Sequence, residues 1–156
     1  MSAAVAQGGP VLRPLAEVRA SVGADTLPGT RIVIAWFAAL SEGRYEDAAA
    51  LMVPDGPYWL LRQRNTMANA AFPKIIAEMV GPTFTQPIAW KLGAITEQDD
   101  RVAVVAESYA PLTAGGVYEN MYHFLFRIQD DRILEGYEFG DTYRSAQTFA
   151  KPPGQK

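Results

Sequence analysis

Residues Gly115–Tyr143 read GGVYENMYHFLFRIQDDRILEGYEFGDTY, and this stretch predicts a β-hairpin. A Gly-Gly loop precedes two runs rich in aromatic and β-branched residues, and a polar turn at Gln129-Asp130-Asp131 joins them. Polar side chains interrupt these otherwise apolar runs at Tyr118, Asn120, Tyr122, His123, Glu138 and Asp141. Because a carboxylate is costly to bury on the core face of a strand, the direction in which Glu138 points becomes the central question for function.

The alternation of side chains along a strand divides these residues into two sets. If Tyr122 faces a pocket, then Tyr118, Asn120, Phe124 and Phe126 face it too, and His123 points the other way with Met121 and Leu125. On the second run, one face is shared by Leu134, Gly136, Glu138 and Gly140, and the glycines beside Glu138 leave space for a ligand or an approaching backbone. A β-bulge would exchange the two sets. Glu138 is therefore the first candidate for a functional carboxylate, and Asp141 is the reserve.

The rest of the chain predicts helices first and strands afterwards. Helices are predicted over Leu27–Glu42, Tyr45–Met52 and Asn69–Val80, with a short strand over Tyr58–Leu61. Long strands follow over Thr83–Glu97 (with a possible break at Pro87), Arg101–Leu112, Tyr118–Ile128 and Arg132–Thr142. Helices placed ahead of an antiparallel sheet indicate an α+β domain, which we place at residues 25–150. Residues 1–24 are predicted to be a flexible arm with a short helical turn over Pro14–Ser21, and residues 151–156 a disordered tail.

Composition excludes several classes of function. A net charge of −3 gives no basic surplus for neutralising phosphates, so no nucleic-acid partner is expected. The chain has no cysteine and a single histidine, which excludes thiolate chemistry and multi-histidine zinc sites. No apolar run has the length of a membrane span, and the first residues make a poor secretory signal. We therefore expect no membrane partner and a cytoplasmic location.

Metal and cofactor binding are also not expected. The plausible metal ligands are Glu107, His123, Glu138 and Asp141, and strand alternation scatters them. The glycine pairs at Gly8-Gly9 and Gly115-Gly116 lack the surroundings of a phosphate-binding loop.

A wider pattern resembles a known family. It runs from Trp36-Phe37-x-Ala39-Leu40-x-x-Gly43-x-Tyr45-x-x-Ala48-x-x-Leu51 through Tyr58-Trp59 to Tyr122-His123-x-x-Phe126 and Glu138-x-x-Asp141-Thr142. This pattern, over about residues 27–149, resembles the SnoaL-like branch of the nuclear-transport-factor-2-like superfamily, which includes ketosteroid isomerase, limonene epoxide hydrolase and the polyketide cyclases. The resemblance implies a cone-shaped, curved antiparallel or mixed sheet wrapping three N-terminal helices, with an apolar pocket between them.

The residues of two well-known enzyme types of this fold are only partly matched. The ketosteroid isomerase positions fall on Trp36, Tyr122 and about Leu60, so the catalytic base of that mechanism is missing. For limonene epoxide hydrolase the last-strand acid falls on Glu138, but its two partners fall near Ser108 and Ala110, which cannot serve. Neither reaction is expected to proceed by its known mechanism.

A shorter motif is similar to the condensing proteins of phenazine biosynthesis, which share this fold. It consists of Tyr118-Glu119-Asn120 followed by Glu138-Phe139, and the resemblance implies that Tyr118 and Glu138 belong to an active site. The histidine that those proteins carry on the third helix has no counterpart in the predicted helix Asn69–Val80.

Strand alternation and the family resemblance together define a candidate site. The candidate catalytic residues are Glu138, Tyr122 and Tyr118, and the candidate ligand contacts are Asn120, Trp36, Tyr58, Trp59, Phe124, Glu107 and Asp141. Several have structural alternatives: Glu138 as a hydrogen-bonded buried acid, Asp141 as a turn cap, Trp36 as core. Glu107 shares a strand face with Val105 and Tyr109 that could point inward, and one of Tyr58 and Trp59 is expected to line the pocket. Arg62 and Arg64 lie in solvent or guard the pocket mouth, where either could pair with an anionic substrate.

Two hypotheses of function remain open. The first is a cofactor-independent enzyme, of isomerase, cyclase or dehydratase type, in which Glu138 acts as general acid or base on a small hydrophobic molecule. The second is a protein of the same fold that binds small molecules or partners without catalysis. In either case the outer sheet face, with Met121, His123 and Leu125 beside Tyr137 and Phe139, predicts a homodimer.

Overall fold

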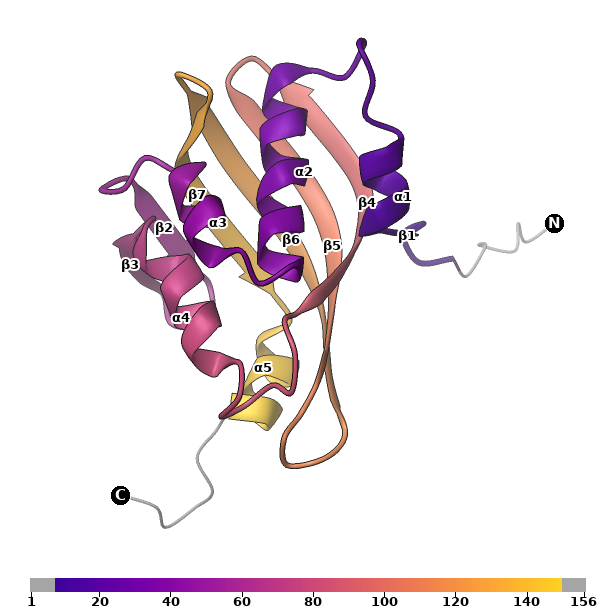
Figure 1. Ribbon diagram of the computed structural model, residues 1–156, viewed down its shortest axis with the longest axis vertical. Coiled ribbons are helices and arrows are strands. Elements are labelled where there is room, and N and C mark those ends of the chain that lie inside the picture. Colours follow the sequence, from indigo (N-terminus) through magenta and orange to yellow (C-terminus); the bar gives the residue numbers. More distant parts are fainter. Residues whose placement is uncertain (1–7, 150–156) are drawn as a thin grey trace, which may run out of the picture.

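The predicted hairpin is present in the computed structural model, which describes residues 8–149 (Figure 1). Strand β6 (Val117–Gln129) pairs antiparallel with β7 (Arg132–Gly140), and Tyr122 lies opposite Gly140 while Phe124 lies opposite Glu138. The turn residues Asp130 and Asp131 have φ angles of 50° and 56°, a left-handed conformation that aspartate adopts more readily than most residues.

Alternation along β6 is as predicted, whereas β7 contains one irregularity. Every second residue of β6 from Tyr118 to Phe126 is buried. The register of β7 shifts between the pairs Arg127–Glu135 and Ile128–Ile133, so one extra residue is accommodated there. As a consequence Ile133 is fully buried and Leu134 is only half-buried. The prediction that Leu134 faces inward together with Glu138 is therefore wrong at this end of the strand.

In the described part of the chain these two strands belong to a seven-stranded mixed sheet with the order β1-β4-β5-β6-β7-β2-β3. The further strands are β1 (Arg13–Pro14), β2 (Pro57–Leu60), β3 (Asn65–Ala68), β4 (Ala89–Gln98) and β5 (Arg101–Pro111). Strand β2 runs parallel to β7 and places Leu60 beside Glu138. The sheet is open, and the α+β class is confirmed.

Within residues 8–149 five helices accompany the sheet, and four of them precede its long strands. They are α1 (Leu15–Ala20), α2 (Pro28–Ser41), α3 (Tyr45–Ala50), α4 (Ala71–Met79) and α5 (Thr142–Phe149). In Figure 1 the first four lie in front of the sheet, and α5 lies below it at the end of β7. The predicted helices that correspond to α2, α3 and α4 are confirmed; α3 begins at Tyr45 as predicted, and the other ends are one or two residues shorter.

Three parts of the chain differ from the prediction. The long strand predicted from Thr83 begins only at Ala89, because residues 83–88 form turns and isolated bridges around Pro87, which has no N–H for a ladder. Strand β3 and helix α5 were not predicted, because NTMA is a short polar run and TYRSAQTF, although amphipathic, contains few apolar residues. The predicted strand over Arg132–Thr142 ends at Gly140.

Part of the predicted N-terminal arm is packed on the domain. Strand β1 pairs with Leu92 and Lys91 of β4, and Leu15 and Val18 of α1 are each only 7% exposed. The helical turn expected over Pro14–Ser21 is thus present at Leu15–Ala20, and its apolar face holds it to the sheet. The remaining parts of the predicted arm and tail that fall on residues 1–7 and 150–156 lie outside the described residues.

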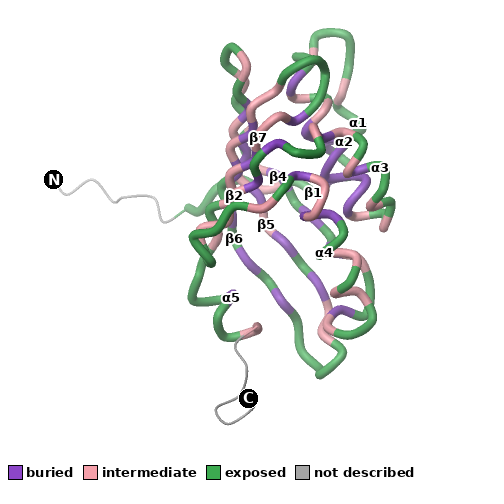
Figure 2. The backbone as a smooth tube through the Cα atoms, turned by 90° about the vertical axis from the view of Figure 1, so that its left-hand side faces the viewer, coloured by how far each residue is buried: buried purple, intermediate pink, exposed green. Residues whose placement is uncertain are grey.

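The core lies between the helices and the inner face of the sheet. Trp36 and Phe37 of α2 are fully buried and contact Phe124 and Phe126 of β6 through edge-to-face arrangements. Figure 2 shows buried and exposed residues alternating along the strands, as expected for a sheet that is covered on one face.

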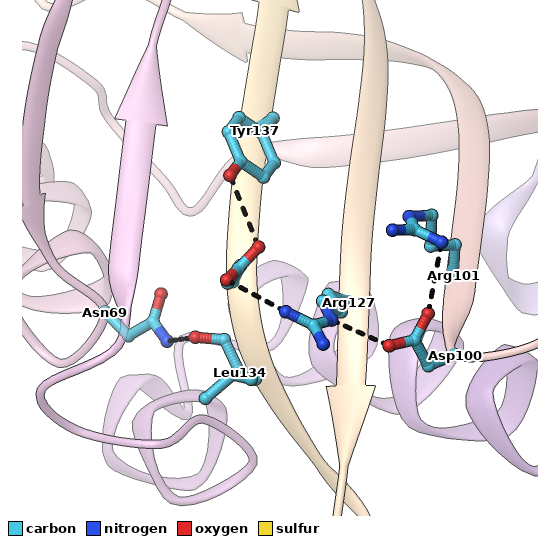
Figure 3. Close-up of polar contacts among 7 residues, drawn as sticks. Asn69, Asp100, Arg101, Arg127, Leu134 and Tyr137 are labelled. Atoms are coloured by element: carbon cyan, nitrogen blue, oxygen red, sulfur yellow. Dashed lines mark hydrogen bonds and ion pairs between the residues drawn. The ribbon is translucent and has the colours of Figure 1, made fainter.

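The outer face carries a row of charged and polar groups near the turn of the hairpin (Figure 3). Arg127 lies between Asp100 and Glu135, with Nε–O and Nη–O distances of 2.7 and 3.4 Å, and Tyr137 donates its hydroxyl to Glu135 at 3.3 Å. Ion pairs with this much solvent contact contribute little to stability. These ion pairs therefore determine the charge distribution on the outer face but contribute little to the free energy of folding.

Candidate functional site

A cavity of about 290 Å³ lies between α4, α5 and the inner face of the sheet. Its wall is mostly apolar, and a small set of polar groups lies within it. The lining residues are Leu60, Arg62, Gln63, Met67, Phe72, Ile75, Ile76, Met79, Phe84, Ile88, Trp90, Tyr118, Tyr122, Glu138, Gly140, Ser145 and Phe149. An apolar cavity with a few convergent polar groups is the usual form of a small-molecule site.

Glu138 is the one carboxylate among the residues that line this cavity. Its Oε2 accepts a hydrogen bond of 3.0 Å from the hydroxyl of Tyr58, and within residues 8–149 it forms no ion pair. Desolvation raises the pKa of Glu138 to about 7, and the hydrogen bond from Tyr58 opposes that shift only in part. A carboxyl group in this state can exchange a proton near neutral pH.

Two aromatic rings occupy the space beside the glycines that flank Glu138. A Cβ atom on Gly136 would lie 2.5 Å from Cδ2 of Tyr58, and one on Gly140 would lie 2.7 Å from Cε1 of Tyr122. The space that these glycines were predicted to leave is therefore taken by the two rings, although Gly140 also lines the cavity. Glycine is needed so that Tyr58 and Tyr122 can lie against β7 on either side of the carboxylate.

A hydrogen-bond network fixes the two phenols of β6. Asn120 Nδ2 donates to the Tyr118 oxygen at 2.9 Å and to Ser145 Oγ at 3.1 Å. Ser145 Oγ in turn donates to the backbone carbonyl of Asp141 at 3.2 Å. The hydroxyl groups of Tyr118 and Tyr122 share a hydrogen bond of 2.7 Å, which either of them can donate. When Tyr118 donates it, the Tyr122 proton is available for an acceptor in the cavity. Burial raises the pKa of Tyr122 far above its usual range, so this phenol remains a neutral donor.

The three candidate catalytic residues therefore line one cavity. Glu138 lies opposite Phe124 and Tyr122 lies opposite Gly140, so the acid and the phenol are diagonal neighbours on adjacent strands. Such neighbours are about 7–8 Å apart between Cα atoms. This spacing lets a small molecule contact the carboxyl and the phenol together.

The candidate ligand contacts on the inner side lie behind the cavity wall. Asn120 holds Tyr118, and Tyr58 is fully buried, stacks on Phe72 at a centroid distance of 4.1 Å and holds Glu138. Trp36 and Phe124 are core residues whose rings contact each other, and neither lines the cavity. These four side chains support the site without reaching into it.

The remaining candidates lie elsewhere. Glu107 points to the outer face, where it forms a 2.8 Å ion pair with Lys91. Trp59 packs against Phe139 on the outer face with ring centroids 5.4 Å apart. Asp141 is exposed and accepts a hydrogen bond of 2.9 Å from the backbone N–H of Tyr143 in the first turn of α5. None of these three residues lines the cavity, so the prediction that they contact a ligand there is wrong. For Asp141 the geometry supports the structural alternative, in which its side chain caps the start of α5.

Sequence reasoning did not find several residues of the site. Trp90 and Ser145 line the cavity, although Trp90 belongs to β4 and Ser145 to α5. The indole Nε1 of Trp90 is buried and has no hydrogen-bond partner among residues 8–149. The amphipathic pattern of α5 was the available signal for Ser145 and Phe149, but that helix was not predicted.

The described residues offer no arrangement suited to a metal ion. Within residues 8–149 no three side chains of His, Asp or Glu gather in one place. None of the helices in the same range is long and apolar enough to cross a membrane.

Comparisons with known proteins place these features in a family context. The sequence profile of the SnoaL-like domain matches residues 33–136. No curated protein matches the chain. A solved nuclear-transport-factor-2-like protein of unknown function from Burkholderia pseudomallei superposes with a TM-score of 0.69 at 11% identity, over 81% of this chain and 100% of that one.

Two further solved structures have the same fold. IdmH from Streptomyces antibioticus, provisionally described as a polyketide cyclase, has a TM-score of 0.66 at 15% identity, over 79% of this chain and 99% of that one. An epoxide hydrolase of M. tuberculosis, similar to limonene epoxide hydrolase, has a TM-score of 0.65 at 16% identity, over 78% and 88% respectively. At these identities the likeness concerns the fold alone.

Proposed function

This chain belongs to the SnoaL-like domain family, and from that premise we propose that it is a cofactor-independent enzyme that moves a proton on a small hydrophobic molecule. The observation that carries the proposal is Glu138, whose carboxyl group lies in an apolar cavity and has a pKa of about 7. A general base or acid works best when its pKa is near the operating pH.

The proposed reaction uses two groups of the cavity. Glu138 removes a proton from a carbon next to a carbonyl group, and the electrons move to the carbonyl oxygen. Tyr122 donates a hydrogen bond to the oxygen on which charge develops. In an isomerisation, the protonated Glu138 returns the proton to another carbon of the substrate. In a cyclisation, the enolate carbon first bonds to a second carbonyl carbon of the same molecule, the π electrons of that carbonyl move to its oxygen, and this oxygen takes the proton from Glu138.

A chemical probe tests the base without knowledge of the substrate. 5-Nitrobenzisoxazole opens when a base removes its ring C–H proton: the N–O bond breaks, and a coloured cyanophenolate forms. We expect the protein to accelerate this reaction with a rate that rises with pH around 7, because the ionised form of Glu138 is the base. Glu138→Gln should lower kcat/KM about 100-fold, within the usual range for removal of a general base.

A matched control is Glu119→Gln, which changes an exposed acid on the outer side of β6 and should leave kcat/KM unchanged. Full activity of Glu138→Gln, with an intact fold by circular dichroism, would remove Glu138 from the mechanism. That result would favour the alternative function, a protein of this fold that binds small molecules without catalysis.

We also propose that the protein forms a homodimer through its outer sheet face. On this face His123 lies opposite Phe139 and Leu125 lies opposite Tyr137. Met121 and Phe139 are 37% and 40% exposed, and helices α1 to α4 lie on the other side of the sheet (Figure 1). Exposed apolar side chains gathered on one sheet face are typical of an interface between subunits.

Analytical ultracentrifugation tests the dimer. We expect the wild-type protein to sediment as a dimer at micromolar concentration and Met121→Arg to sediment as a monomer, because two copies of a desolvated charge would face each other across a two-fold axis. Leu27→Arg is the control, since Leu27 is 53% exposed at the start of α2, away from the outer face. A monomeric wild-type protein would contradict the proposal.

A further inference from the structure

The cavity has a closed end and an open end, which the exposure of its lining residues distinguishes. Trp90, Tyr118 and Tyr122 at the closed end are each less than 10% exposed. Arg62, Gln63 and Ile75 line the same cavity and are exposed, so they form its mouth.

Arg62 follows directly after the segment that pairs with Glu138 through its backbone. Leu60 is the strand neighbour of Glu138, the backbone N–H of Leu61 donates to the Glu138 carbonyl at 3.0 Å, and Arg62 is the next residue. Glu138 and Arg62 both line the cavity, so the same apolar space borders the carboxyl group and the side chain of Arg62.

The charge of Arg62 is not neutralised by the described part of the protein. Arg19, Arg44 and Arg127 each contact a carboxylate, whereas Arg62 forms no ion pair within residues 8–149. Its Cζ instead lies 5.3 Å from the centroid of the Phe149 ring, which also lines the cavity. Stacking on an aromatic ring holds the guanidinium group at the mouth while its N–H donors stay available to a ligand.

Glu138 does not use this charge. The influences on its pKa are desolvation and the Tyr58 hydroxyl, and its carboxylate lies outside ion-pair distance of Arg62. The cavity thus holds a cation at its mouth that is separate from the proton-transferring group in its interior.

We propose that the ligand is an apolar, ring-containing molecule with one anionic group, and that Arg62 binds this group at the mouth while the apolar body lies over Glu138. This inference rests on the proposed function in that it names the substrate class of the same cavity. The lining of aliphatic and aromatic side chains fits the body of such a molecule, and a guanidinium group fits a carboxylate, sulfonate or enolate.

A pair of fluorescent probes separates charge from apolar contact. 8-Anilinonaphthalene-1-sulfonate carries the negative charge, and N-phenyl-1-naphthylamine has the same ring system without it. In fluorescence titrations at low salt we expect Arg62→Gln to weaken binding of the sulfonate about 10-fold and binding of the neutral amine less than twofold. Added salt should weaken sulfonate binding to the wild-type protein but not to Arg62→Gln.

Two controls locate the effect. Arg64→Gln changes an exposed arginine of the same turn that does not line the cavity, and it should leave both affinities unchanged. In methyl-labelled isoleucine spectra, the sulfonate should shift the signals of Ile75, Ile76 and Ile88, which line the cavity, and leave that of Ile95 unchanged.

The inference would be overturned if Arg62→Gln affected both probes equally or neither, if the wild-type protein bound neither, or if Ile95 shifted in place of the cavity isoleucines. Because these measurements detect binding alone, they are independent of proton transfer. Sulfonate binding that depends on Arg62, combined with full activity of Glu138→Gln toward 5-nitrobenzisoxazole, would keep the ligand class and reject the enzymatic role of Glu138.

Discussion

We expect Asn69→Asp to lower the free energy of unfolding by about 3–5 kcal/mol at pH 7, the usual effect of an unpaired buried charge. Asn69 is fully buried between β3 and α4. Its Nδ2 donates to the carbonyl oxygens of Val53, Ile133 and Leu134 at 2.9, 3.2 and 2.8 Å, and the last of these contacts is drawn in Figure 3. The substitution keeps the shape of the side chain but presents a carboxylate to these acceptors.

The local packing leaves no room for the backbone to relax. A Cβ atom on Gly56 would lie 2.0 Å from the carbonyl oxygen of Leu134, so the loop before β2 already lies directly against β7. The hydrogen bonds of Asn69 thus connect this loop, and with it the hairpin β2–β3, to β7, the strand that carries Glu138.

Urea denaturation followed by tryptophan fluorescence measures this effect. Asn65→Asp is the control, because Asn65 is exposed at the start of β3, and its side chain accepts a hydrogen bond from the neighbouring N–H of Thr66 and forms no other among residues 8–149. The control should change stability by less than about 0.5 kcal/mol, as is usual for surface substitutions. If Asn69→Asp lowered the free energy of unfolding by less than about 1 kcal/mol, the hydrogen bonds of Asn69 would not be needed for stability.

The second large effect concerns the pH dependence of stability, which Glu138 should dominate. Its pKa is about 7 in the folded protein, against an ordinary value of 4.5. Between these values the folded state binds the proton more tightly than the unfolded state, so stability is full below pH 4.5 and falls as the pH rises through 7. At 1.36 kcal/mol per pKa unit, the loss is about 3 kcal/mol.

Glu138→Gln should remove this loss. Glutamine resembles the protonated carboxyl group and can keep the hydrogen bond with Tyr58. We therefore expect the variant to equal the wild-type protein at pH 4 and to be more stable by about 3 kcal/mol at pH 8.5. The same substitution is expected to lower activity, which is the trade-off typical of a functional group held in an unfavourable environment.

Urea titrations between pH 4 and pH 9 test this prediction, with Glu119→Gln as a control that should follow the wild-type curve. If wild-type stability does not fall relative to Glu138→Gln between pH 5 and pH 8, then the carboxyl group is not desolvated in solution. The proposed general base would then lack its physical basis.

The hairpin sequence divided the side chains of each strand into two faces, since side chains alternate on every strand, and the polar groups among apolar residues indicated which face to expect inward. Tyr118, Tyr122 and Glu138 were expected on the inward faces of the two strands, and all three line the cavity. The α+β class followed in the same way from the order of helical and strand periodicities. Local rules suffice for such features because they depend only on neighbours along the chain.

Alternation alone did not determine which face of β5 points inward, and the wrong choice put Glu107 in the pocket. A single strand has two equivalent faces, and only pairing with β4 and β6 assigns Glu107 to the side of Lys91 and Met121. The role of the glycines beside Glu138 was misjudged for a related reason, because the ring of Tyr58 comes from a strand about 80 residues earlier.

The sequence by itself therefore determined the class of fold and the acid to examine, through periodicity and the cost of a buried charge. The tertiary structure alone decided the environment of that acid: a phenol from β2 behind it, phenols from β6 beside it and an arginine at the mouth. The pKa of a carboxyl group depends on desolvation and on partners within a few ångströms. Those partners come from strands and helices far apart in the sequence, so they are known only once the chain has folded.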